Sequence, residues 1–168
     1  ADTYYSTTDF TDILSDAKSD TAFYHELNKA LVGSKAQKRL IEHIRSTYYR
    51  NLLTGALPLH NLESLALPFE SYQLAYTPEL VTYIFGAKVN AALLTEGKFT
   101  NSEGDSNWWV RSGTTQFKAI AENQSDAQDR FYAPISYTDP YGAITQVKYY
   151  GDYFLFIEEL EDALGSKS

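Results

Sequence analysis

The stretch that decides the fold is SYTDPYGAITQVKYYGDYFLFIEELEDALG, residues 136–165. It contains the pattern Asp-x-x-Gly twice, and each turn residue recurs 23 positions later, Asp139 at Asp162 and Gly142 at Gly165. Asp139, Pro140 and Gly142 suit a type I turn, because Asp bonds the following backbone, Pro presets the second position and Gly is favoured at the fourth. An alternating strand, a Gly-Asp turn and an apolar strand lie between the two turns. The pattern predicts a strand-turn-strand unit of 23 residues, and the second Asp-x-x-Gly turn marks the start of the next copy of this unit.

A single unit of this kind cannot bury its own apolar face. Such units stack on copies of themselves, and roughly three or more are needed for a stable array. The helical first half would then cover the first unit, and the strand edge after Glu161 would pair with the next one. Because Asp-x-x-Gly turns are common, the alternative is one hairpin of a self-contained domain. We expect the repeat array.

Apolar spacing in the first half predicts helices over residues 7–17, 20–33, 34–49 and 77–97. Ser34 and Gln37 have the spacing of a capping box at the start of the third helix. The buried stripe of that helix is predicted to comprise Leu40, Ile41, Ile44 and Tyr48. Thr77 and Pro78 are a cap and first-turn pair for the fourth helix, which should end at Gly97.

Between the third and fourth helices the chain is rich in leucine, but prolines at positions 58, 68 and 78 interrupt it. We expect an apolar wrapping segment without a long regular element. After Gly97 the sequence changes to short β segments at 107–110, 114–120, 130–137, 143–150 and 153–160. The expected fold class is α+β, with a helical cap region at residues 1–99 packed on an antiparallel β meander at residues 100–168. Side chains predicted to pack under the helices are Phe131, Ile135, Val147 and Leu155.

Composition excludes several classes of function. With 168 residues, of which 43% are hydrophobic, the chain can form one compact unit with a sizeable core. A formal net charge of -8 repels nucleic acid, whose affinity comes mainly from phosphate contacts. The absence of cysteine excludes disulfides and zinc–thiolate sites. No apolar run reaches the length of a membrane span. Because the chain begins with Ala1 and contains no Met, we expect an excised piece of a larger protein.

The sharpest polar cluster has side-chain oxygens at alternate positions, Asn101, Glu103, Asp105 and Asn107. It resembles a calcium loop, but an EF-hand requires Gly and Glu where Ser106 and Ser112 stand. Glu103 and Asp105 could also be read as a glycosidase pair, although neighbours two apart on a turn need not face one substrate. The three histidines, His25, His43 and His60, lack metal-ligand spacing. We therefore predict no catalytic, metal-binding or cofactor-binding residue.

Trp108 and Trp109 are adjacent on a predicted strand, so their side chains point to opposite faces. At most one of them can enter a given core, and the other is a candidate for an interface. This observation supports an alternative function, a carbohydrate- or protein-binding module that uses surface Trp and Tyr side chains.

Six sequence segments, in the same order along the chain, carry a resemblance to a known family. They are RLIEHIRSTYYR (39–50), LPLHNLESLALPFESYQLAYTPELV (57–81), EGKF (96–99), SEGDSNWW (102–109), FYAPISYTDPYGAITQVKYYGDYFL (131–155) and DALG (162–165). Together they resemble the B component of bacterial insecticidal toxin complexes, and the last stretch is similar to the wider Rhs or YD-repeat proteins. The similarity runs from about Gln37 to Gly165. Two departures are Ala143, where the family often has Asn, and His60, where it often has Gly.

The resemblance implies that this chain is a non-enzymatic structural segment of a large secreted, extracellular bacterial protein. In that family, strand repeats wind into a hollow shell, which encloses a toxic fragment supplied by a C component. The partners implied are neighbouring repeats of the parent chain, the C component and a polypeptide cargo. The family's self-cleavage residues belong to the C component, so no catalytic residue is carried over. Asp139, Pro140, Gly142, Asp162 and Gly165 would shape the YD-type turns.

Overall fold

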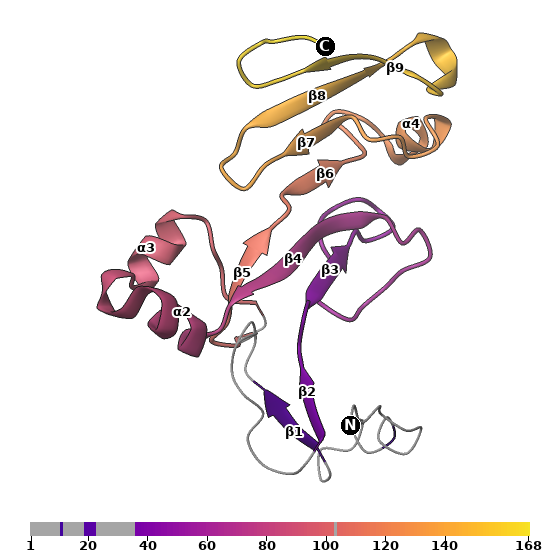
Figure 1. Cartoon of the computed structure of the whole chain (residues 1–168). Helices are drawn as coiled ribbons and strands as arrows, with labels where there is room; N and C mark the ends of the chain where they lie inside the picture. Colours follow the sequence, from indigo (N-terminus) through magenta and orange to yellow (C-terminus); the bar gives the residue numbers. More distant parts are fainter. Residues whose placement is uncertain (1–10, 12–18, 23–35, 103) are drawn as a thin grey trace, which may run out of the picture.

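The computed structural model describes residue 11 and residues 19–22, 36–102 and 104–168. Helix and strand are mixed, the strands are mostly antiparallel, and the helices are few and short. Figure 1 shows the sheets following one another along the molecule, with the C-terminal sheet at the opposite end from β1 and β2. The coarse prediction of an α+β fold is confirmed.

Three sheets make up the described part of the chain. A parallel pair joins β1 (Ser19–Ala22) and β2 (Ala36–Arg39). An antiparallel sheet of three strands has the order β3 (Ile44–Tyr48), β4 (Pro68–Tyr76) and β5 (Trp108–Arg111). A second antiparallel sheet follows as a meander of β6 (Thr114–Gln116), β7 (Ser136–Thr138), β8 (Ile144–Tyr149) and β9 (Ile157–Glu161).

The predicted helix over residues 34–49 is wrong, because this segment forms β2 and β3. Three members of its expected buried stripe are exposed, Leu40 at 41%, Ile41 at 79% and Ile44 at 54%, whereas Tyr48 is half-buried. Thr47 and Tyr49 are buried instead, in the alternation of a strand with one inward face. Isoleucine, threonine and tyrosine fit a pleated surface well, so pairing with β4 prevails over the helical spacing. The segment between prolines 58 and 78 likewise contains a strand of nine residues, β4.

The predicted helix over residues 20–33 begins in the structure with strand β1, and the rest of it lies outside the described residues. The helix predicted over residues 7–17 also lies outside them, apart from Thr11.

Two short helices occupy the segment for which one helix was predicted. Helix α2 (Pro78–Phe85) begins as expected, with the Thr77 hydroxyl accepting a hydrogen bond from the Leu80 backbone N–H at 3.2 Å. Gly86, with φ 56°, ends α2, and a 3₁₀ turn, η1 (Gly86–Lys88), follows. Helix α3 (Ala91–Glu96) then begins at the cap Asn90 and ends at Gly97, as predicted. A further short helix, α4 (Gln124–Asp129), precedes β7.

The helices of the described residues, α2, α3 and α4, are not gathered at the N-terminus over the meander. Figure 1 shows α2 and α3 beside the sheet of β3, β4 and β5, and α4 near the meander. This corrects the expectation of N-terminal helices packed on a C-terminal sheet. Phe131 and Leu155, expected under helices, are 80% and 73% exposed. The domain boundary near residue 100 stays a prediction, although strands from both sides of it share one sheet.

Two aromatic clusters hold the described chain together. In the first, the fully buried Trp109 packs with Leu74 and Leu80 between the sheet and α2. In the second, Tyr49 of the β3 end makes edge contacts with Phe69 and Phe117, with ring centroids 4.9 and 5.7 Å away. The Tyr49 hydroxyl donates to the Thr115 carbonyl at 2.8 Å, which ties the end of β3 in the three-stranded sheet to β6 of the meander.

Candidate functional site

The chain crosses from one sheet to the next at Ser112 and Gly113, between β5 and β6. The Ser71 N–H donates to the Ser112 hydroxyl at 3.0 Å, and the Ser112 N–H donates to the Ser71 carbonyl at 2.9 Å. Gly113 has φ +82°, and a Cβ built on it would lie 2.2 Å from the Thr138 carbonyl oxygen. Only glycine therefore fits this crossing, where the backbone passes directly against β7.

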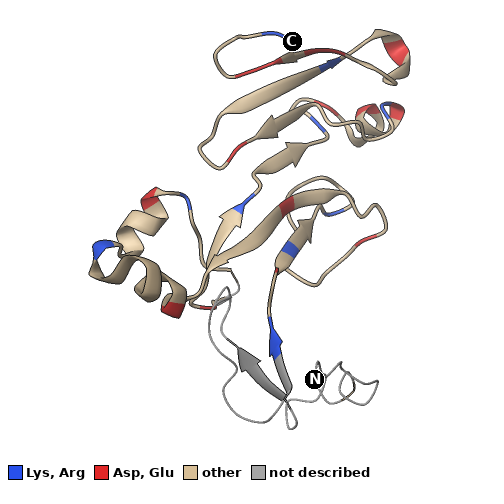
Figure 2. Cartoon of the chain, in the orientation of Figure 1, with Lys and Arg blue, Asp and Glu red and all other residues tan. Residues whose placement is uncertain are grey.

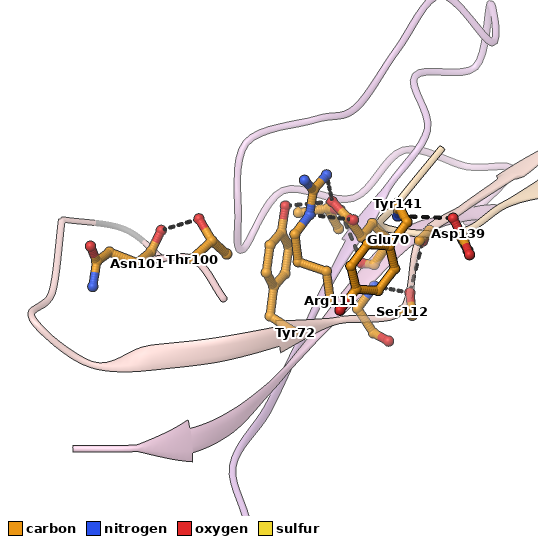
Figure 3. A network of polar contacts seen from close by, with 11 residues as sticks. Glu70, Tyr72, Thr100, Asn101, Arg111, Ser112, Asp139 and Tyr141 are labelled. Atoms are coloured by element: carbon orange, nitrogen blue, oxygen red, sulfur yellow. Dashed lines mark hydrogen bonds and ion pairs between the residues drawn. The ribbon is translucent and has the colours of Figure 1, made fainter. Parts of the chain in front are cut away.

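A buried carboxylate lies beside the crossing. Glu70 on β4 is 3% exposed. Its two carboxylate oxygens accept hydrogen bonds from Arg111, one from Nε at 2.7 Å and one from Nη2 at 3.0 Å. The Tyr72 hydroxyl donates to the same carboxylate at 2.7 Å (Figure 3). Burial and this hydrogen bond raise the pKa of Tyr72 to about 12, and the bond to Glu70 raises the pKa of Arg111. Because both oxygens have partners, the group links β4 to β5.

The polar side chains considered as a calcium loop or a glycosidase pair are bound to other groups of the protein. Asp105 accepts the Trp109 indole N–H at 3.1 Å and pairs with Arg45 at 3.2 Å. The Arg45 guanidinium lies 4.0 Å from the centroid of the same indole. Asn101 donates to the Asn107 carbonyl at 2.8 Å, and Glu103 lies outside the described residues. Within the described residues no three potential metal ligands gather.

The two tryptophans occupy different environments, as their adjacency on a strand predicts. Trp109 is fully buried, so its indole is not on the surface of this chain. Trp108 is half-buried, and of the two it is the one left as an interface candidate. Sequence reasoning missed Arg45 and Asp105 as the partners that hold Trp109, since neither residue type by itself signals a contact with an indole.

The two Asp-x-x-Gly turns have the same hydrogen bonds. Asp139 Oδ1 accepts the N–H groups of Tyr141 and Ala143, both at 2.8 Å, and the Gly142 N–H donates to the Asp139 carbonyl at 3.1 Å. A further bond, from the Asp139 N–H to the Ala143 carbonyl at 2.9 Å, closes the turn. Gly142 has φ 90°, which suits glycine.

The second turn repeats each of these bonds. Asp162 Oδ1 accepts the N–H groups of Leu164 at 2.9 Å and Ser166 at 2.8 Å, and the Gly165 N–H donates to the Asp162 carbonyl at 3.0 Å. The Asp162 N–H donates to the Ser166 carbonyl at 3.0 Å, and Gly165 has φ 81°. The backbone N–H groups of Ser166 and Leu164 lower the pKa of the Asp162 carboxyl.

The repetition extends beyond the turns. Phe131 and Phe154, which are also 23 positions apart, both have φ 54°. In the first copy Tyr137 pairs with Thr145 across β7 and β8. In the second copy the equivalent residues Leu160 and Ser168 exchange two backbone hydrogen bonds, of 2.9 and 3.0 Å. The last residues of the chain therefore begin another strand against β9, in the register of the copy before it.

Two hollows flank the crossing. The larger, of about 360 Å³, lies against β6, β7 and β8 and is lined by Ser112, Gly113, Thr114, Thr115, Tyr137, Thr138, Asp139, Ala143 and Thr145. The smaller, of about 190 Å³, lies between the segment after α3 and the first Asp-x-x-Gly turn. At its edge the Tyr141 hydroxyl reaches the Gly97 carbonyl at 3.4 Å.

Charged side chains pair across the last strands of the meander. Lys148 on β8 pairs with Glu158 at 2.9 Å, and Lys167 pairs with Glu159 at 2.9 Å and Glu161 at 3.1 Å. Figure 2 shows the acidic residues of β9 running along this strand. These pairs are exposed, so they favour the strand register without adding much stability.

Comparison with known proteins gives a distant likeness. No family model matches the chain, and no curated protein matches it. Among solved structures, the chain is similar to part of the crystal structure of TcdB2-TccC3-TEV, with a TM-score of 0.40 and 14% sequence identity. The match covers 74% of this chain and 7% of that chain, so this sequence spans a small fraction of that protein's length. Within the described residues, no helix is long and apolar enough to cross a membrane.

Proposed function

We propose that this chain is a non-enzymatic structural segment of a large secreted protein of the YD-repeat or toxin-complex type. Its work would be to start a β array that contributes to a shell around a polypeptide cargo. Its partners would be the neighbouring repeats of the parent chain, a C component and that cargo. The observation that carries the proposal is the 23-residue period, which the two turns share bond for bond.

The outer edge of β9 supports an array rather than a closed sheet. Leu160 and Ser168 already pair there, in the register that Tyr137 and Thr145 have one unit earlier. A bridge between Glu161 and Lys167 repeats the pairing of Thr138 with Ile144. A sheet edge that presents paired residues in a fixed register is a template for the next strand.

Exposed apolar side chains near this edge support the same proposal. Tyr153, Leu155 and Phe156 are 79%, 73% and 72% exposed in the connection between β8 and β9, and Leu164 in the second turn is 92% exposed. Tyr153, Leu155 and Phe156 lie before β9 and Leu164 lies after it, so these side chains flank the two ends of the strand. Large exposed apolar side chains beside a strand edge are typical of a surface that another element covers. In an array, the following unit would cover them.

Two of the described carboxylates support a non-enzymatic role. Glu70 is held by Arg111 and Tyr72, and Asp105 is held by Trp109 and Arg45. A general acid or base needs a carboxyl group within reach of a substrate, and these two carboxyls are occupied by protein donors.

The test extends the chain by the codons that follow Ser168 in the native reading frame. We expect a further Asp-x-x-Gly unit there. When the next 23 or so residues are added, the amide protons on the outer edge of β9 should exchange more slowly with solvent. A matched control carries the same added residues in scrambled order and should leave amide exchange along β9 unchanged. A native stop codon directly after Ser168, or equal exchange in both extended proteins, would contradict the proposal.

A further inference from the structure

The larger hollow lies on one face of the meander. Thr115, Tyr137 and Thr145 are Cα partners across β6, β7 and β8, so their side chains form a row on the same face. The neighbouring row on that face contains Ala143, whose small side chain leaves the space beside Tyr137 open. The resulting hollow of about 360 Å³ is within the range of small-molecule sites.

The chemistry of this hollow is polar and nearly uncharged. Tyr137 is 44% exposed and presents an aromatic ring between two threonines. Among the described residues, the side-chain hydroxyls of Thr115, Tyr137 and Thr145 have no protein hydrogen-bond partner. Asp139 is the one charged residue among those that line the hollow. Its Oδ1 accepts two N–H groups of the turn, so Oδ2 is the carboxylate oxygen left to accept a hydrogen bond from a ligand.

These features select one class of ligand. An anion is disfavoured, since no Lys or Arg lines the hollow and the chain carries a net charge of -8. An apolar ligand would leave the row of hydroxyls without partners. A sugar ring has an apolar C–H face that can lie on an aromatic ring, and its hydroxyls both donate and accept hydrogen bonds.

We propose that this face binds a neutral saccharide, with one sugar ring stacked on Tyr137 and its hydroxyls bonded to Thr115, Thr145 and Asp139. The site differs from the interface suggested by the tryptophans, because Trp109 is buried in another part of the molecule. It also stands apart from the proposed repeat array, since it needs no residue beyond this chain.

The test measures binding of four neutral trisaccharides, maltotriose, cellotriose, mannotriose and chitotriose, to the 168-residue chain by NMR titration. We expect at least one of them to shift the resonances of Thr115, Tyr137 and Thr145 with a saturable curve. Tyr137→Ala should weaken that binding roughly tenfold or more, and Thr145→Val, which keeps the shape and removes the hydroxyl, by severalfold. Ala143→Leu should fill the hollow and abolish binding without removing a polar group.

Tyr150→Ala is the matched control, since Tyr150 is 69% exposed and does not line this hollow. It should bind the sugar as the unchanged protein does. The proposal is overturned if none of the four sugars shifts these resonances at millimolar concentration. It is equally overturned if Ala143→Leu, with an unchanged NMR fingerprint elsewhere, binds as well as the unchanged protein. Neither result bears on the extension experiment for the repeat array.

Discussion

Replacing Gly113 by alanine should destabilise the protein far more than the same change at other left-handed glycines. An added Cβ would lie 2.2 Å from the Thr138 carbonyl oxygen and 2.9 Å from Asp139 Cα. Both are backbone atoms, of the last residue of β7 and of the first residue of the turn after it, so neither can rotate away as a side chain could. The left-handed conformation costs an alanine about 1–2 kcal/mol, and relieving such a clash costs about 1–3 kcal/mol more. We expect a loss of about 3–4 kcal/mol in the free energy of unfolding.

Gly142→Ala is the matched control for this prediction. Gly142 also has a positive φ, of 90°, but no atom lies within 4 Å of a Cβ built on it. Gly142→Ala should therefore lower the free energy of unfolding only by the conformational cost of about 1–2 kcal/mol. Urea unfolding followed by circular dichroism gives both values through the shift in the transition midpoint.

The difference between the two variants isolates the close approach of the β5–β6 crossing to β7. If Gly113→Ala and Gly142→Ala lose the same stability, the two sheets do not meet at this point, and the reasoning fails. A larger loss for Gly113→Ala, with native-like secondary structure retained, would support the crossing as the joint between the sheets.

Three further predictions concern ionisable side chains. The folded-state pKa of Tyr72 is raised to about 12, so its contribution to stability is present below pH 10 and is lost as the pH rises toward 12. The difference in unfolding free energy between the unchanged protein and Tyr72→Phe should therefore shrink over this range, from an initial value of about 1 kcal/mol for a half-exposed ring. Arg111→Met leaves the Glu70 carboxylate buried without its cation. Because the arginine side chain is 40% exposed, we expect the free energy of unfolding, measured in urea, to fall by about 2 kcal/mol. A change near zero would contradict the role given to the pair. The lowered pKa of Asp162 means that the turn is stabilised above the usual carboxyl range and loosened as the pH falls through the folded-state value. The protection of the Leu164 amide, measured as its exchange rate relative to the intrinsic rate at each pH, should fall there, and Asp162→Ala should remove that pH dependence of the protection.

Much of the meander could be predicted from local sequence, because its signals are local. Asp139, Pro140 and Gly142 specify their turn through their own backbone preferences, and Thr77 with Pro78 specifies the start of α2. In each case the residues that carry the signal also make the contacts. The second copy of the turn was found for the same reason.

The sheet of β3, β4 and β5 could not be predicted in this way, because its strands pair over long distances in the sequence. β3 and β4 are separated by a loop of residues 49–67 that contains Pro58, and β5 lies more than thirty residues further on. Ile44 and Tyr48 satisfy a helical period as well as a strand period, and only the partner strand decides between them. The hollow beside Tyr137 was missed because it depends on which residues face one another across three strands.

The shared register of Leu160 with Ser168 and of Tyr137 with Thr145 limits how such a chain can change in length. One inserted residue in β8 would turn every later side chain to the opposite face, exposing what should be covered. Gain or loss of 23 residues at once would instead return each position to an equivalent neighbour. Proteins built on this period should therefore differ from their relatives by whole modules within the strands, and by single residues only in the loops.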